Sequence, residues 1–170
     1  MPAISLRIAL AADLSAINSI YNHYVIHSTA TYQTEPTTLT EREAWFAAHG
    51  PEHPAIVAER EGEVVGWGSL SKFHARAAYR PTVENSVYVR HDALARGIGR
   101  LLLEDLITRA QALEYHSIMA LISADQGPSV RLHAAFEFAQ VGLLREVGRK
   151  FDRWLDVMYM QKMLLQRGGT

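Results

Sequence analysis

The sequence predicts a mixed α/β or α+β fold, a sandwich in which helices cover a sheet. Its length of 170 residues suits one domain around one hydrophobic core. Segments whose apolar residues recur at helical spacing are interspersed among segments that alternate or are uniformly apolar. No internal repeat, low-complexity tract or linker interrupts them, so we expect residues 1–170 to form a single domain.

The chain is expected to begin with a strand and a helix. The stretch ISLRIAL predicts a strand over residues 4–10, and Asp13 follows as the expected N-cap of a helix. A polar loop over residues 28–38 comes after the helix. The apolar positions of the helix share one face, as their spacing shows: Leu14, Ile17, Ile20, Tyr21 and Tyr24.

A short helix and a hairpin complete the first half. Thr40 and Glu43 have the spacing of a capping box, which predicts a short helix over residues 44–49. Residues 55–60 and 64–73 are expected to form a β-hairpin around the turn at residues 61–63.

The second half alternates strands with helices. Residues 82–90 predict a strand, and a helix is expected to run from the stretch LARGIGR to about Leu113. Residues 116–123 predict a buried strand, and Pro128 is placed to start the next helix. The remaining segments are expected to be a loop at residues 74–81 and two final antiparallel strands at residues 139–148 and 153–164.

The composition excludes several classes of function. The formal net charge is −1, so the overall charge favours neither nucleic acid nor an anionic membrane as a partner. The absence of cysteine excludes a disulfide scaffold, a thiolate zinc site and a cysteine nucleophile. His23 and His27 stand four residues apart without an accompanying third ligand, so we expect a surface pair and no metal site.

Neither a signal peptide nor a membrane span is expected. Arg7 interrupts the apolar run near the N-terminus, and Asp13 follows soon after. The stretch at residues 14–34 lacks Asp, Glu, Lys and Arg but is rich in Asn, Ser, Thr, His and Gln. The cytoplasm is therefore the expected compartment.

The stretch LARGIGR, residues 94–100, places two glycines where a strand ends and a helix begins. Backbone N–H groups and the helix dipole make such a helix start an anion site, which glycine lets the ligand approach closely. Arg96 and Arg100 can add charge-assisted hydrogen bonds. No Gly-Lys-Ser/Thr end follows, as a Walker loop requires, and Leu102 stands where a Rossmann turn has its third glycine. Taken alone, the pattern is also that of a plain helix start.

This stretch resembles the acyl-CoA pyrophosphate loop of the GNAT N-acetyltransferase superfamily, Gln/Arg-x-x-Gly-x-Gly/Ala, with Leu94 at its first position. Four further blocks extend the resemblance over nearly the whole chain: IYNHYVIHSTATYQTEP, TVENSVYV, SVRLHAAFEF and KFDRWLDVMYMQ. Together and in this order they are similar to the phosphinothricin acetyltransferase family. Members of that family act on phosphinothricin, methionine sulfone and methionine sulfoximine.

The resemblance implies a GNAT fold, in which a mixed, mostly antiparallel central sheet flanked by helices splays open at the acyl-CoA site. It implies acetyl-CoA as co-substrate and no metal. The pantetheine arm of the cofactor would pair with the strand at residues 82–90. The expected cofactor contacts are Val87, Tyr88, Val89, Ala95, Arg96, Gly97, Ile98, Gly99, Arg100 and Gln126, the last of which stands where relatives carry an asparagine.

Two side chains are expected to transfer protons. Acetyl transfer from a thioester to an amine requires an acceptor for the amine proton and a donor for the oxyanion, and protonation helps the thiolate leave. The resemblance places a general base at Glu84 and a second proton-transfer residue at His133, with a backbone N–H near Val89 facing the oxyanion. The structural alternatives are that Glu84 is an ordinary surface glutamate and that His133 is a histidine of the hydrophobic core. Glu137 stands where the family usually has glycine.

The resemblance also implies a pocket for a small amino-acid-like acid. Arg76 and Tyr79 are expected to hold its acidic end, because a guanidinium suits a carboxylate or phosphinate and a hydroxyl adds a neutral hydrogen bond. The other expected contacts are Tyr32, His74, Ala75, Asn85 and Ser86, with Lys72 and Phe73 at the rim and Lys150, Phe151 and Trp154 closing the site across a homodimer interface.

The predicted function is therefore acetyl-CoA-dependent N-acetylation of the α-amine of such an acid, by direct attack on the thioester. One alternative is a GNAT enzyme for another amine, such as a peptide, a protein or a polyamine. Another is a non-catalytic acyl-CoA-binding sensor. Arg76 favours a small anionic substrate, and the pair of Glu84 and His133 argues against a sensor. No nucleic acid or membrane partner is expected, and a homodimer is.

Overall fold

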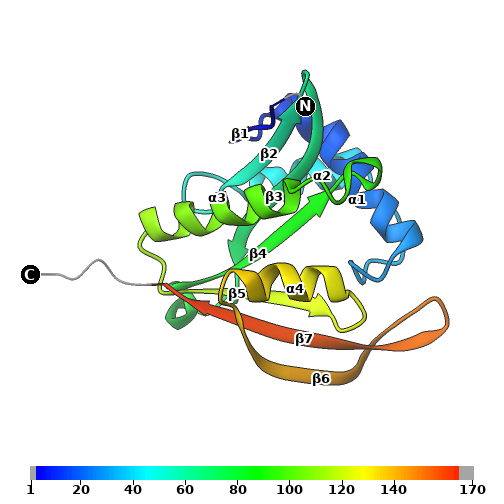
Figure 1. Ribbon diagram of the computed structural model, residues 1–170, viewed down its shortest axis with the longest axis vertical. Coiled ribbons are helices and arrows are strands. Elements are labelled where there is room, and N and C mark those ends of the chain that lie inside the picture. Colours follow the sequence, from blue (N-terminus) through cyan, green and yellow to red (C-terminus); the bar gives the residue numbers. More distant parts are fainter. Residues whose placement is uncertain (1–2, 165–170) are drawn as a thin grey trace, which may run out of the picture.

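The computed structural model describes residues 3–164, which form a seven-stranded sheet with helices on both faces (Figure 1). The strands are β1 (Ser5–Ile8), β2 (Ala55–Arg60), β3 (Glu63–Lys72), β4 (Thr82–Val89), β5 (Ser117–Ser123), β6 (Ala139–Lys150) and β7 (Arg153–Met163). The helices are α1 (Leu14–His27), α2 (Leu39–Ala47), α3 (Ile98–Ala112) and α4 (Gly127–Ala135), with short 3-10 turns η1 (Ala11–Asp13), η2 (Ala77–Tyr79) and η3 (His91–Ala93). None of these helices is long and apolar enough to cross a membrane.

The strand order is β1-β2-β3-β4-β5-β7-β6, and only the pairing of β4 with β5 is parallel. The expected class, a mixed and mostly antiparallel sheet flanked by helices, is therefore confirmed. The hairpin of β2 and β3, the strand β4 and the final pair of β6 and β7 lie within a few residues of their predicted positions.

Two hydrophobic cores lie on opposite faces of the sheet. On one face α3 packs through residues such as Leu102 and Leu106, and on the other α1 packs through Ile17 and Ile20 against Trp67. Because side chains alternate along a strand, β4 contributes to both cores, with Val87 on the α3 face and Tyr88 on the α1 face.

The predicted capping box of the short helix is wrong by two residues. Thr38, not Thr40, is the N-cap of α2, since its hydroxyl accepts from Glu41 N at 3.2 Å while the Glu41 carboxylate accepts from Thr38 N at 2.8 Å. The same Thr-x-x-Glu spacing occurs twice in this stretch. The earlier pair is selected because Asn22 holds Thr37 by two backbone hydrogen bonds of 2.8 Å, which fixes where the chain enters the helix.

Asp13 precedes α1 as predicted, but its side chain does not cap that helix. The carboxylate instead accepts from Arg7 at 2.7 and 2.9 Å and from Leu10 N at 2.7 Å. The Arg7 hydrogen bonds hold the pKa of the Asp13 carboxyl below its usual value. The aspartate therefore ties β1 to the turn η1.

Candidate active site

The sheet opens between β4 and β5, and the opening begins at Glu84. Only three residues of β4, Thr82 to Glu84, pair with β5, whereas β5 continues along β7 to Ser123. Figure 1 shows β4 and β5 diverging beyond this point. From Asn85 to Val89, β4 pairs with β3 alone. The expected splay of the sheet is thus present.

Beyond Glu84, one edge of β4 faces this opening without a partner strand. Arg90 N donates to Val65 O on the β3 side at 2.9 Å, whereas Val89 O accepts from the Tyr24 hydroxyl on the other side. Backbone groups alternate in direction along an antiparallel strand, so the amides and carbonyls of Asn85, Val87 and Val89 face away from β3. An extended ligand with amide groups can pair with that edge.

A cavity of about 720 Å³ occupies the opening. It is lined by fourteen of the predicted site residues: Tyr32, Glu84, Asn85, Ser86, Val87, Tyr88, Val89, Ala95, Gly97, Ile98, Gly99, Arg100, Gln126 and His133. Five predicted site residues do not line it: His74, Ala75, Arg76, Tyr79 and Arg96.

The glycine turn forms the end of the cavity at the start of α3. Ala95 and Gly97 both have left-handed backbone angles, with φ of 59° and 78°. Gly97 is the N-cap of α3. Because glycine has no side chain, the N-cap residue makes no side-chain hydrogen bond to the first N–H groups of the helix. Arg100 lies with its guanidinium 4.8 Å from the centre of the Phe136 ring. This arrangement suits an anion at the helix N-terminus.

Glu84 lies at the branch point of the sheet, half-buried, opposite Ser71 on β3 and Met119 on β5. Burial raises the pKa of its carboxyl above the ordinary value, because the charged form loses hydration. A carboxylate with a raised pKa at the edge of a cavity is suited to accept a proton.

His133 reaches the same cavity from α4, on the other face of the sheet. It is 4% exposed, with Nδ1 2.8 Å from Ser129 O and Nε2 3.0 Å from Asn85 Nδ2. Burial lowers the pKa of its imidazole, an effect that the hydrogen bond to Ser129 O partly opposes. The ring packs edge-on against Phe138 at 5.0 Å.

The loop between α1 and α2 walls the cavity on the side of β5 and β7. The Tyr32 hydroxyl lies 2.9 Å from Asp156 O and 3.0 Å from Ser123 Oγ. Gln126 donates its amide to Thr29 Oγ1 at 2.8 Å, so this nitrogen is engaged within the wall instead of being free for a cofactor. Thr29 in turn donates to Asp125 Oδ1 at 2.7 Å.

Lys150 does not close a substrate pocket as expected. It is 5% exposed, and its ammonium group donates to Ser28 O at 2.7 Å and to Thr31 O at 2.8 Å. These carbonyls follow the C-terminus of α1, where helical carbonyls lack partners and attract a cation. Phe151 and Trp154 are 52% and 60% exposed and do not line the cavity.

The loop that carries Arg76 lies at the surface. Arg76 and Tyr79 are exposed, and Tyr79 packs against the ring of His74 with centroids 4.7 Å apart. The Arg76 backbone N–H donates to His74 Nδ1 at 3.2 Å. The structure therefore brings Glu84, Asn85 and the glycine turn into one cavity but leaves the Arg76 loop outside it.

Several cavity residues were missed by the sequence patterns. Tyr24, assigned only to the apolar face of a helix, places its hydroxyl on Val89 O. Thr31 and Ser123 also line the cavity. A tyrosine on an apolar face is the one available signal, because its polar tip must find a partner when it is buried.

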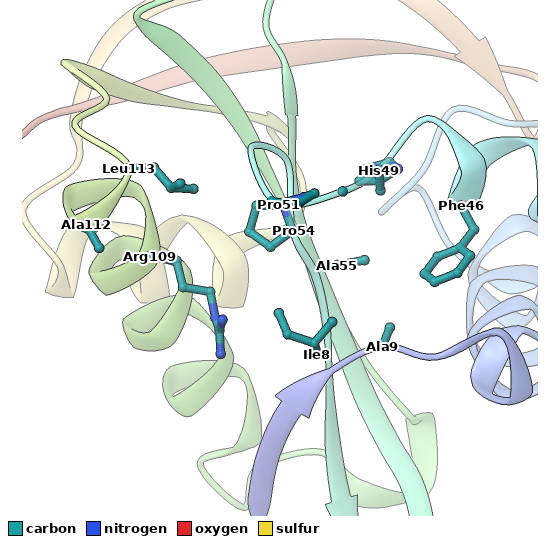
Figure 2. A pocket seen from close by; sticks show the side chains of 11 residues that line it. Ile8, Ala9, Phe46, His49, Pro51, Pro54, Ala55, Arg109, Ala112 and Leu113 are labelled. Carbon is teal, nitrogen blue, oxygen red and sulfur yellow. The ribbon is translucent and has the colours of Figure 1, made fainter.

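A second hollow of about 530 Å³ lies where β1 ends, beside the loop before β2 and the end of α3 (Figure 2). Ile8, Phe46, Pro54, Arg109 and Leu113 are among its lining residues, and none of the predicted site residues is. Within residues 3–164, no group of three or more His, Asp or Glu is placed to hold a metal ion. The predicted pair of His23 and His27 has ring centres 4.8 Å apart, and His23 stacks on His91 at 3.9 Å.

Comparison with known proteins places this geometry in a family context. Residues 6–159 match the acetyltransferase (GNAT) domain family. An L-methionine sulfoximine/L-methionine sulfone acetyltransferase of Pseudomonas paraeruginosa is 41% identical over 159 residues, which is 92% of each chain. A phosphinothricin acetyltransferase of Sinorhizobium meliloti, solved in complex with acetyl-CoA, superposes with a TM-score of 0.92 at 39% identity, covering 95% of this chain and 88% of that one. A structure of a ribosomal-protein-alanine N-acetyltransferase of Brucella melitensis superposes with a TM-score of 0.92 at 40% identity, covering 94% and 99%.

Proposed function

The chain belongs to the GNAT acetyltransferase family and is therefore an acyltransferase that uses acetyl-CoA, and we propose that its acceptor is the α-amine of a small amino-acid-like acid. The acceptor class follows the relatives named for methionine sulfoximine, methionine sulfone and phosphinothricin. The observation that carries the proposal is the position of Glu84, at the point where β4 leaves β5.

The residues around the opening fit acetyl-CoA. The edge of β4 that faces away from β3 offers the Val87 N–H and carbonyl and the Val89 N–H, which match the amides of a pantetheine arm, whereas Val89 O is held by the Tyr24 hydroxyl. A Cβ built on Gly97 meets nothing within 4 Å, so the turn has room for a pyrophosphate against the N-terminus of α3. Arg100 lines the cavity at this end and supplies a positive charge.

Acetyl-CoA supplies an acetyl group activated as a thioester. Glu84 takes a proton from the ammonium of the acceptor, directly or through a water. The amine nitrogen then forms a bond to the thioester carbon, the carbon–sulfur bond breaks, and CoA leaves as the thiol, because the second proton of the amine neutralises its thiolate. The Val89 N–H faces the opening and is the proposed oxyanion donor. Cysteine is absent from the chain, so no cysteine nucleophile can form an acetyl-enzyme.

Arg76 and Tyr79 are proposed to hold the acidic end of the acceptor. Their loop leads directly into β4 at Thr82, two residues before Glu84, which supports a place beside the acceptor. A second copy of the chain is the proposed partner for the exposed apolar side chains of the β6–β7 hairpin, among them Val141, Val147 and Trp154. These assignments follow the family resemblance of the chain.

The relative named for ribosomal-protein alanine favours a second candidate, an enzyme for protein N-terminal amines. Release of CoA thiol with L-methionine sulfone, L-methionine sulfoximine, L-phosphinothricin and a peptide with N-terminal alanine separates the two. The proposal predicts release with at least one of the three amino acids and none with the peptide. Release with the peptide alone would contradict it.

A further inference from the structure

Asp125 is the centre of a network of side chains beside one wall of the cavity. Its Oδ1 accepts from Thr29 Oγ1 at 2.7 Å and from Ser123 Oγ at 2.8 Å. Its Oδ2 accepts from the Arg153 guanidinium at 2.8 Å. Thr29 and Ser123 are 3% and 6% exposed and line the cavity, whereas Asp125 does not line it. The aspartate therefore reaches the cavity through these two hydroxyl groups.

The hydrogen bonds of Asp125 determine the direction of both hydroxyl groups. Burial alone would raise the pKa of the Asp125 carboxyl, but the hydrogen bonds from Thr29, Ser123 and Arg153 hold this pKa below its usual value. The carboxylate is therefore ionised near neutral pH and can only accept hydrogen bonds. Each hydroxyl group directs its single hydrogen to Asp125. Toward every other neighbour, the Thr29 hydroxyl is then an acceptor.

This direction fixes the orientation of the Gln126 amide. Gln126 Nε2 lies 2.8 Å from Thr29 Oγ1 and donates to it. A flipped amide would place Oε1 against an oxygen whose hydrogen is already directed to Asp125, so two acceptors would face each other. The amide therefore keeps Nε2 on Thr29, and Oε1 is its remaining polar atom.

Gln126 Oε1 is accessible to a ligand. Gln126 lines the cavity and is only partly buried. Within residues 3–164, the buried side-chain nitrogen and oxygen atoms without a hydrogen-bond partner are Trp67 Nε1 and Asn85 Oδ1. Gln126 Oε1 makes no hydrogen bond among these residues and is not one of those two atoms, so it keeps accessible surface. Because Gln126 follows the end of β5, it lines the opening on the side across from β4.

We propose that Asp125, acting through Thr29, positions the Gln126 amide so that Oε1 accepts a hydrogen bond from an amide N–H of the pantetheine arm. The arm carries secondary amides and is proposed to run along β4, so Gln126 holds it from the opposite side of the cavity. The inference rests on that proposed placement of the cofactor. The family resemblance implied a contact at Gln126. The network adds the atom that makes it and two positioning residues, Asp125 and Thr29.

Calorimetric binding of CoA and of adenosine 3′,5′-bisphosphate to wild type, Asp125→Ala and Thr29→Val tests the inference. CoA carries the pantetheine arm, whereas the bisphosphate carries only the nucleotide end. Without Asp125 the Thr29 hydroxyl can donate to a flipped amide, and valine keeps the shape of threonine but removes the hydroxyl. Both variants should bind CoA about five- to tenfold more weakly, the effect of one hydrogen bond. Their affinity for the bisphosphate should be unchanged, which also shows that they are folded.

Two further measurements distinguish positioning from a general structural effect. If Asp125 acts through Gln126, Asp125→Ala should weaken CoA binding in wild type but not further in Gln126→Met, which has no amide. The KM for acetyl-CoA should rise with the loss of CoA affinity, whereas kcat should stay within about threefold, because Glu84 is not part of the network. Glu104→Ala removes an exposed carboxylate and is the control, which should match wild type throughout.

The outcomes separate this inference from the proposed placement of the cofactor. If wild type binds CoA better than the bisphosphate but the two variants weaken neither ligand, or both ligands equally, the positioning role is wrong and the placement stands. An equal loss of CoA affinity from Asp125→Ala with and without the Gln126 amide would also overturn the positioning role. If wild type binds CoA no better than the bisphosphate, the placement along β4 is wrong as well.

Discussion

The ring of Tyr32 lies directly against the backbone of Gly148. A Cβ built on Gly148 would stand 2.6 Å from both Cδ2 and Cε2 of Tyr32. The glycine in β6 is therefore what allows this aromatic ring to form the wall of the cavity. Its φ lies outside the left-handed region, so the requirement is for space and not for an unusual backbone angle.

Gly148→Ala should displace Tyr32 and destabilise the fold. Overpacking of this kind costs about 1–3 kcal/mol, which exceeds the small gain from replacing a glycine within a strand. Gly142→Ala in the same strand is the matched control, because its Cβ would approach no atom closer than 3.9 Å. Thermal unfolding of the two variants measures the difference. Equal melting temperatures would show that the ring does not lie where the structure places it.

Lys150→Met should destabilise the fold by about 2–3 kcal/mol. The hydrogen bonds from the charged ammonium group are lost, and the buried carbonyls of Ser28 and Thr31 are left without this donor. For a chain of this size we expect the melting temperature to fall by about 5–10 °C. Lys72→Met is the control, because Lys72 is exposed and substitutions at the surface change stability by less than about 0.5 kcal/mol. A similar small loss in both variants would contradict the role given to Lys150.

Local patterns predicted much of the fold. The β2–β3 hairpin and β4 follow from alternation, and the start of α3 follows from its glycine turn. The first residue of α2 could not be predicted, because two Thr-x-x-Glu pairs have the spacing of a capping box. The hydrogen bond between Asn22 and Thr37, far away in the sequence, favours the earlier pair.

Long-range partners explain what the sequence did not show. Lys150 was expected to face a substrate, yet it bonds to Ser28 O, 122 residues away in the sequence. The splay of the sheet is equally non-local, because β4 loses its partner where β5 turns toward β7. Only the family resemblance implied it. The pairing of Asn85 with His133 spans 48 residues and joins side chains that were assigned to substrate and to proton transfer.

Glu84→Gln should raise thermal stability at neutral pH. Burial raises the pKa of Glu84 in the folded state, so the folded protein bears the cost of a partly buried charge above that pKa. Glutamine at this position carries no charge, so the free-energy penalty of burying the carboxylate is absent. As the pH falls through the raised pKa, the wild-type carboxyl becomes neutral and the advantage of the variant should vanish. Melting temperatures of both proteins between pH 4 and pH 8 give the check, and a difference that does not change with pH would contradict it.

Gly97→Ala should weaken CoA binding through the turn at α3. An L-residue in the left-handed region costs about 1–2 kcal/mol. Gly62→Ala is the matched control, because its φ of 81° is close to the 78° of Gly97 and neither Cβ meets an atom within 4 Å. Both variants should lose similar stability. Only Gly97→Ala should lose CoA affinity, measured by calorimetry, and an equal loss in both would place the anion elsewhere.

The most direct measurement is the release of CoA thiol from acetyl-CoA by wild type and by Glu84→Gln, with L-methionine sulfone as acceptor. The chain has no cysteine, so the protein adds no thiol to the signal. Exposed Glu104→Gln serves as the control substitution. We predict acceptor-dependent release by wild type and Glu104→Gln, and a loss of at least about a hundredfold in Glu84→Gln with CoA binding retained. Release by Glu84→Gln at the wild-type rate would show that the carboxylate at the branch of the sheet is not the base.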